Sequence, residues 1–190
     1  MFPVDWMLLD WFVYGSLKPD EFHVQPAPFV ERPFREILGR PMPAAAEEIT
    51  AEESLRYKRE VLARQFYRIR DAIKETSPGT RILFNVPYWK SAEAVWVDHP
   101  MLQESDALLA ECTYPEVVEW LLSVRRPEQR VMTTILGRPD EATDPSSWRR
   151  WYEAGCDFFA YGSGTPPDFR PHPRYAGGLK IVREAFRKID

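Results

Sequence analysis

Short apolar runs that end on a polar or aromatic residue recur along the chain. The first of them, residues 6–9, is followed by Asp10 and Trp11. A strand of a parallel sheet that is buried on both faces is a nearly continuous apolar run, and its polar residues collect at its ends. We therefore expect parallel strands near Met7, Ile82, Leu108, Val131 and Phe158. Their predicted carboxyl-end residues, in one register, are Asp10, Asn85, Glu111, Thr134 and Tyr161.

Helical patterns lie between these runs. Thr50-Ala51-Glu52-Glu53 is a capping box, and the apolar spacing after it predicts a helix that ends near Ser77. The residues expected to face inward from this helix are Leu55, Leu62, Phe66, Ile69 and Ile73. Further helices are expected from Ser91 with an interruption at His99-Pro100, from Pro115, from Pro145 to Ala154, and from Tyr175 to Ile189. Strands that alternate with helices predict an α/β fold with a parallel sheet and right-handed crossovers.

The connections between these elements differ in length. Turns from helix to strand are short, whereas loops from strand to helix are long and rich in aromatic and polar residues. This asymmetry predicts function at the carboxyl ends of the strands. Residues 15–49 hold six prolines and predict a long ordered loop with no long helix or central strand.

The composition is that of one globular domain over residues 1–190. Hydrophobic residues make up 44% of the 190 residues and charged residues 28%. The formal net charge of -4 gives no electrostatic basis for binding nucleic acid. The N-terminal apolar stretch carries Asp5 and Asp10 without a basic leader, which predicts no membrane span and, by default, a cytoplasmic protein.

Several familiar kinds of site are not expected. Cys112 and Cys156 lie in or beside apolar runs, outside any CxxC motif, and are predicted to be buried free thiols. The three histidines are far apart in the sequence, so we expect neither a metal nor another cofactor. The motifs of P-loops, nucleophile elbows, zinc proteases and dinucleotide-binding folds do not occur.

A pair of carboxylates is the remaining candidate chemistry. Asp10 and Glu111 are predicted to end the first and third strands, which places their backbones roughly 10 Å apart along one rim. Glycosidases hold two carboxyl groups about 5 to 5.5 Å apart when they retain configuration and about 6.5 to 9.5 Å apart when they invert it, and side chains that lean inward permit such spacings. The structural alternative is that Asp10 caps a loop and that Glu111 pairs with an arginine such as Arg138.

Three segments together resemble a known family. These are Leu8-Leu9-Asp10-Trp11-Phe12, the arginine-rich helix that leads through Thr76-Ser77-Pro78 to Ile82-Leu83-Phe84-Asn85, and Ala110-Glu111. They resemble the (β/α)8-barrel glycoside hydrolases, specifically those grouped with α-L-fucosidases or classed as hypothetical glycosidases. The resemblance is to the last five of eight βα units. It implies a partial barrel; the alternative from the sequence is an open doubly wound sheet.

The resemblance assigns roles to the strand-end residues. In barrels of this kind Asp10 falls where the nucleophile is found and Glu111 where a general acid/base is frequent, while Asn85 would bind a sugar hydroxyl. The aromatic residues expected to stack on or bond to the sugar rings are Trp11, Tyr14, Tyr88, Trp89, Tyr114 and Tyr161. The alternative function is a noncatalytic module for carbohydrate binding or assembly. Since a five-unit piece leaves sheet edges open, we expect self-association or a partner chain that completes the barrel.

Overall fold

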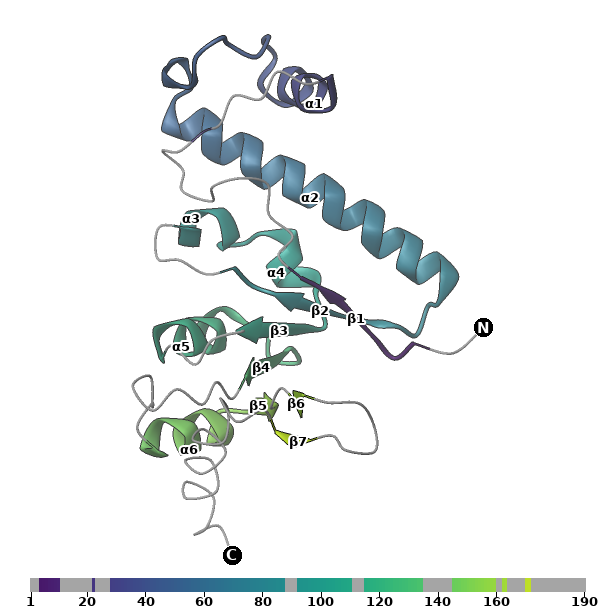
Figure 1. The fold of residues 1–190 in the computed structure, drawn as a ribbon, viewed down its shortest axis with the longest axis vertical. Coiled ribbons are helices and arrows are strands. Elements are labelled where there is room, and N and C mark those ends of the chain that lie inside the picture. The colour runs from purple at the N-terminus through teal and green to yellow at the C-terminus, as the bar shows by residue number, and fades with distance from the viewer. Residues whose placement is uncertain are drawn as a thin grey trace, which may run out of the picture. The chain divides into compact units, whose positions relative to one another are not determined.

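The chain has an α/β fold built on a five-stranded, all-parallel sheet in a computed structural model (Figure 1). The model describes residues 4–10, 22, 28–87, 92–110, 115–134, 145–159, 162–163 and 170–171. The strands of the sheet are β1 (Trp6–Leu9), β2 (Arg81–Asn85), β3 (Ala107–Ala110), β4 (Arg130–Thr134) and β5 (Cys156–Phe159). All five predicted strands are present, so the expectation of a parallel α/β fold is confirmed.

The strand order is β1-β2-β3-β4-β5, which is the order of the sequence. A doubly wound sheet reverses its strand order at a switch point. These five strands contain no reversal.

The chain divides into two units, and the first contains residues 1–82 and 87–105. Its helices are α1 (Pro28–Leu38), α2 (Ala51–Thr76), α3 (Glu93–Trp96) and α4 (Pro100–Glu104), with a short 3-10 helix at Ala46–Glu48. The predicted capping box of α2 is confirmed: the Thr50 side chain accepts a hydrogen bond from the Glu53 amide, and the Glu53 carboxylate accepts one from the Thr50 amide. The break at His99-Pro100 is confirmed as the boundary between α3 and α4.

Helix α1 corrects the expectation that prolines exclude a long helix from residues 15–49. Pro28 is the first residue of α1, where no intrahelical N–H is needed, and Pro33 lies inside the helix. The lost hydrogen bond at Pro33 is offset by packing. Phe34 is fully buried, and its ring lies 5.4 Å from that of Tyr57 on α2.

The buried face of α2 also differs in part from the prediction. Leu62 and Phe66 are buried as expected, but Leu55, Ile69 and Ile73 are only half-buried. The other buried residues of α2 are Ser54 and Lys58, which lie one turn apart and on the same side of the helix as Leu62 and Phe66. Because α2 packs against α1, α3 and α4, its contacts extend beyond the narrow apolar stripe that the sequence shows.

The second unit contains residues 83–86 and 106–190. Its helices are α5 (Pro115–Val124) and α6 (Pro145–Glu153), both beginning at the predicted prolines, and the short strands β6 (Gly162–Ser163) and β7 (Arg170–Pro171) pair antiparallel. Helix α6 covers one face of the sheet, because Trp148 packs 5.0 Å from Phe158 between ring centroids. Helix α5 contacts both α6 and the strands β3 and β4.

Cys156 lies on the helix-covered face and is a buried free thiol, as predicted. Burial raises the pKa of this thiol to about 12, so it stays protonated and unreactive near neutral pH. Cys112 and the predicted closing helix from Tyr175 to Ile189 lie outside the described residues.

Candidate functional site

Two of the predicted site residues belong to the described part of the chain. Asp10 directly follows β1 and is exposed, in the first unit. Asn85 is the last residue of β2 and is 5% exposed, in the second unit. The remaining predicted site residues lie outside the described residues: Trp11, Tyr14, Tyr88, Trp89, Glu111, Tyr114 and Tyr161.

Asn85 occupies a defined place in the β2–β3 ladder. It pairs in register with Leu109, and the amide of Val86 then donates to the Leu109 carbonyl at 2.9 Å. Leu109 pairs with Met132, which pairs with Asp157, so the side chains of these residues and of Asn85 lie on the same face of the sheet. Because successive side chains alternate, this face is opposite to that of Phe158, which α6 covers. Asn85 therefore belongs to the sheet face that points away from α6.

The carboxyl end of β3 is tied to β4 by a buried side chain. The Thr133 hydroxyl donates to the carbonyl oxygen of Ala110 at 3.2 Å, and both residues are fully buried. Ala110 is covalently bonded to Glu111, so Thr133 holds the last carbonyl before the predicted acid/base. Thr134 was predicted as the strand-end residue, and the role of Thr133 was missed. A polar threonine inside the apolar run could have indicated a buried hydrogen bond there.

The predicted end residues do not share one hydrogen-bonded register, which corrects the sequence interpretation. From Asn85 the register leads to Leu109, Met132 and Asp157, which precede Glu111, Thr134 and Tyr161 by two, two and four residues. Glu111 and Thr134 therefore have the same offset of two residues from the register partners of Asn85, whereas Tyr161 has an offset of four.

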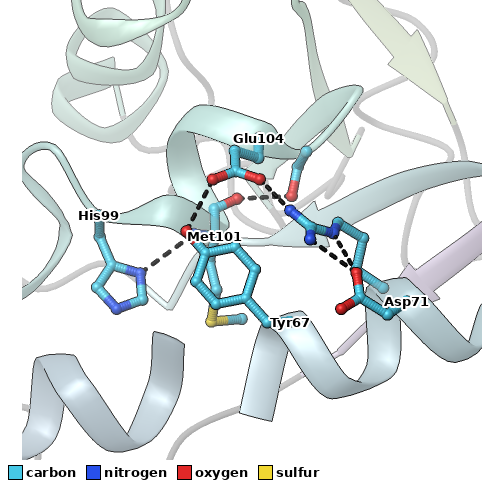
Figure 2. A network of polar contacts seen from close by, with 7 residues as sticks. Tyr67, Asp71, His99, Met101 and Glu104 are labelled. Carbon is cyan, nitrogen blue, oxygen red and sulfur yellow. Dashed lines mark hydrogen bonds and ion pairs between the residues drawn. The ribbon is translucent and has the colours of Figure 1, made fainter. Parts of the chain in front are cut away.

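His99, one of the three histidines considered as metal ligands, has a structural role in the first unit. Its Nδ1 accepts a hydrogen bond from the Met101 amide at 3.2 Å and so caps α4 (Figure 2). Nδ1 is therefore unprotonated, and Nε2 donates to the Arg59 carbonyl at 2.9 Å. Burial lowers the pKa of His99 to about 4, so the ring is neutral at pH 7.

A polar network on the same helices joins α2 to α4 (Figure 2). The Tyr67 hydroxyl donates to Glu104 at 2.9 Å, and Arg70 donates to both Glu104 and Asp71. The bond to Glu104 raises the pKa of Tyr67. These groups are partly exposed and satisfy one another, so the network orients α4 and offers no reactive group.

Neither a metal site nor a membrane span is found in the parts of the chain that can be described. In those ranges, no three His, Cys, Asp or Glu side chains gather as ligands for a metal ion. Within them, too, no helix combines the length and apolar character that crossing a membrane requires.

Comparison with known proteins gives no relative for the chain. No family model, curated protein or solved structure matches it. The resemblance to barrel glycoside hydrolases therefore stays a prediction from the sequence, and the strand ends stay the predicted site.

Proposed function

We propose that this chain is a glycoside hydrolase-like protein that acts on carbohydrate at the carboxyl ends of its parallel strands. One observation carries the proposal: the strands end where the candidate residues begin. Strand β1 ends immediately before Asp10, β2 ends on Asn85, and β3 ends immediately before Glu111. Parallel α/β sheets keep their ligands and catalytic groups at these ends.

We further propose that the sheet is part of a (β/α)8-type barrel. The sequential strand order supports this, since it needs no switch point. The observed strand ends support it as well. Strands β2 to β5 end at Asn85, Ala110, Thr134 and Phe159, which lie zero, one, two and two residues beyond the register partners of Asn85. Strands that tilt about a common axis end in such a stagger, and an eight-stranded barrel with a shear of 8 requires about one residue per step.

The proposed chemistry needs two carboxyl groups in different roles. Glu111 would protonate the glycosidic oxygen as it leaves, and Asp10 would act as the nucleophile or stabilise the positive charge that develops on the sugar. Asn85, an amide with two donors and an acceptor, would bind a sugar hydroxyl. The aromatic residues that follow the strands would stack on the apolar faces of the rings.

Hydrolysis of a panel of 4-nitrophenyl glycosides tests the proposal. We expect the full chain to release nitrophenol from at least one member of the panel, because two carboxyl groups at the strand ends are sufficient for general acid catalysis. A noncatalytic carbohydrate-binding module would raise the melting temperature with a matching sugar yet release no nitrophenol. If no glycoside releases nitrophenol and no sugar shifts the melting temperature, the proposed carbohydrate function is contradicted.

The edge strand β1 predicts association. Strand β1 is first in the sheet order, and the exposed fractions of Val4, Met7 and Leu8 are 48%, 39% and 45%. Met7 and Leu8 are consecutive and so point to opposite faces of the strand. An edge strand with apolar side chains exposed on both faces favours pairing with another strand. We therefore expect self-association or a partner chain that completes the barrel.

Light scattering across the micromolar range measures this association. We expect a mass above that of one chain, which falls when Met7 and Leu8 are replaced by lysine, because charged residues discourage pairing at an edge. Val97→Lys is the control, since Val97 is exposed to a similar degree but lies outside β1. A single-chain mass at every concentration, together with a cooperative melt, would contradict this prediction.

A further inference from the structure

His99 joins three helices at one buried point. It lies in the connection between α3 and α4, and only 1% of it is exposed. Its Nδ1 accepts from the Met101 amide of α4, and its Nε2 donates to the Arg59 carbonyl of α2 (Figure 2). Its ring stands edge-on to Trp96 of α3, with centroids 5.5 Å apart. The two hydrogen bonds together require the neutral ring, in which one nitrogen accepts and the other donates.

The segment formed by α3 and α4 depends on its attachment to α2. The two helices have four and five residues, and helices of this length are not stable alone. Arg59 of α2 donates from Nη1 to three carbonyls at the end of α3, at 2.9 Å to Ala94, 3.0 Å to Val95 and 2.6 Å to Val97. The strand ladders pair residues 83–85, 107–110, 130–134 and 156–159, so this segment contributes no pair to them. Small units of this kind open more readily than a whole domain unfolds.

Protonation of His99 removes the N-cap of α4. A ring with hydrogen on both nitrogens has no acceptor left for the Met101 amide, so two N–H groups then face each other. Loss of a cap destabilises a short helix. The bond from Nε2 to the Arg59 carbonyl survives, but the charged ring is then buried, and it escapes this cost only by reaching water.

The charges around the ring come from all three helices. On α2, the charge of Arg59 opposes protonation and that of Glu60 favours it. The acidic residue of α3 is Glu93 and that of α4 is Glu104, which is already bonded to side chains of α2. Asp98, the adjacent residue, is exposed. Burial has the largest effect, and the pKa of this histidine is lowered to about 4.

We propose that His99 is an acid-sensitive latch: when its ring is protonated, the α3–α4 segment opens from α2 while β3, β4 and β5 stay paired. Trp96 is the last residue of α3, and its Nε1 donates to the Pro87 carbonyl at 3.0 Å. Opening therefore also releases this carbonyl, two residues beyond the end of β2. Burial of Met101 and Leu102 keeps the open form rare at neutral pH. The latch does not depend on the proposed function.

Hydrogen exchange of the full chain between pH 7 and pH 5 tests the latch. The amides to follow are those of Met101, Leu102 and Gln103, because all three donate to His99 in the closed form. The open form binds more protons between the two pKa values of His99, about 4 when closed and 6.5 in water, so opening should become about 20-fold more frequent at pH 5 than at pH 7. We expect the protection factors of these amides, corrected for intrinsic exchange, to fall by that factor, while those of β3 and β4 change much less.

The variants assign the effect to His99. His99→Asn can still cap α4 but does not titrate, so the fall in protection should disappear; His99→Ser serves the same purpose if the asparagine variant fails to fold. Asp98→Asn is the matched control. It removes the exposed carboxylate next to His99, and asparagine tolerates the positive φ of 53° at this position, so the fall should remain.

The wild-type chain alone can overturn the latch. Protection factors that stay constant from pH 7 to pH 5 would contradict it. An equal fall in β3 and β4 would show unfolding of the sheet and not the opening of one segment. A fall that persists in the His99 variants, or that disappears in Asp98→Asn, would assign the pH dependence to another group.

Discussion

Glu111→Gln is expected to lower the turnover of 4-nitrophenyl glycosides by about 10² to 10⁴-fold, the usual contribution of general acid-base catalysis. The amide cannot give a proton to the leaving oxygen, so the loss falls mainly on kcat. The rate of the wild-type protein should be bell-shaped in pH, and the limb at high pH should disappear in this variant. Steady-state kinetics between pH 4 and pH 9 measure both effects.

The leaving group separates the roles of the two carboxylates. A 2,4-dinitrophenyl glycoside has a leaving group that needs no protonation. The Glu111→Gln substitution should therefore lower turnover far less on this substrate than on a 4-nitrophenyl glycoside. Asp10→Asn should lose its activity on both substrates, because the sugar then lacks its nucleophile or counter-charge.

Stability and a matched control complete this test. Asp5→Asn should keep wild-type turnover, since Asp5 is also an exposed carboxylate at β1 but precedes the strand. Asp10 is exposed, so Asp10→Asn should leave the melting temperature within a few degrees of the wild type. A sharp drop in melting temperature would identify Asp10 as a structural cap or ion-pair partner and would remove the main support for a hydrolase.

Acid should destabilise the protein through His99, by about 3 kcal/mol between pH 6.5 and pH 4. The pKa of His99 is about 4 in the folded chain, against an ordinary value of 6.5, and burial is the main cause. Between these values the unfolded chain binds more protons, so stability falls as the pH is lowered. A protonated ring would lose the Nδ1 acceptor that caps α4 and would meet the charge of Arg59.

His99→Asn isolates this contribution. Asparagine is a good N-cap that can accept from the Met101 amide, but it does not titrate. Urea unfolding of both proteins is measured from pH 7.5 to pH 4. As the pH falls, the free energy of unfolding of the wild type should decrease relative to that of the His99→Asn variant. Subtracting the two curves removes the contribution of shared carboxylates such as Glu53, whose pKa is lowered to about 2 chiefly by its hydrogen bond with Arg40. A difference that does not depend on pH would contradict the assignment.

The sheet and the longest helix could be predicted because their signals are local. Each strand is an apolar run, and α2 carries its own capping box at Thr50 and Glu53. Helix α1 could not be predicted in the same way. Local propensity at Pro33 opposes a helix, and the stabilising contact is the packing of Phe34 on Tyr57, which is 23 residues away.

The candidate site could be predicted less completely, for a related reason. The positions of Asp10 and Asn85 follow from where the apolar runs stop. The register between strands depends on how neighbouring strands pair, so it cannot be predicted from any single apolar run. The hydrogen bonds of Trp96 to Pro87 and of Thr133 to Ala110 join different elements, and only folding brings them together.

The most direct test of a carbohydrate site at the strand ends is to map amide resonances during titration with a sugar from the glycoside panel. We expect the shifts to concentrate at the carboxyl ends, on Asp10, Asn85, Val86 and Ala110. The amides at the amino ends, Arg81, Ala107, Arg130 and Cys156, should stay in place. Shifts that concentrate at the amino ends, or a saturating sugar that moves no strand-end amide, would contradict the central claim.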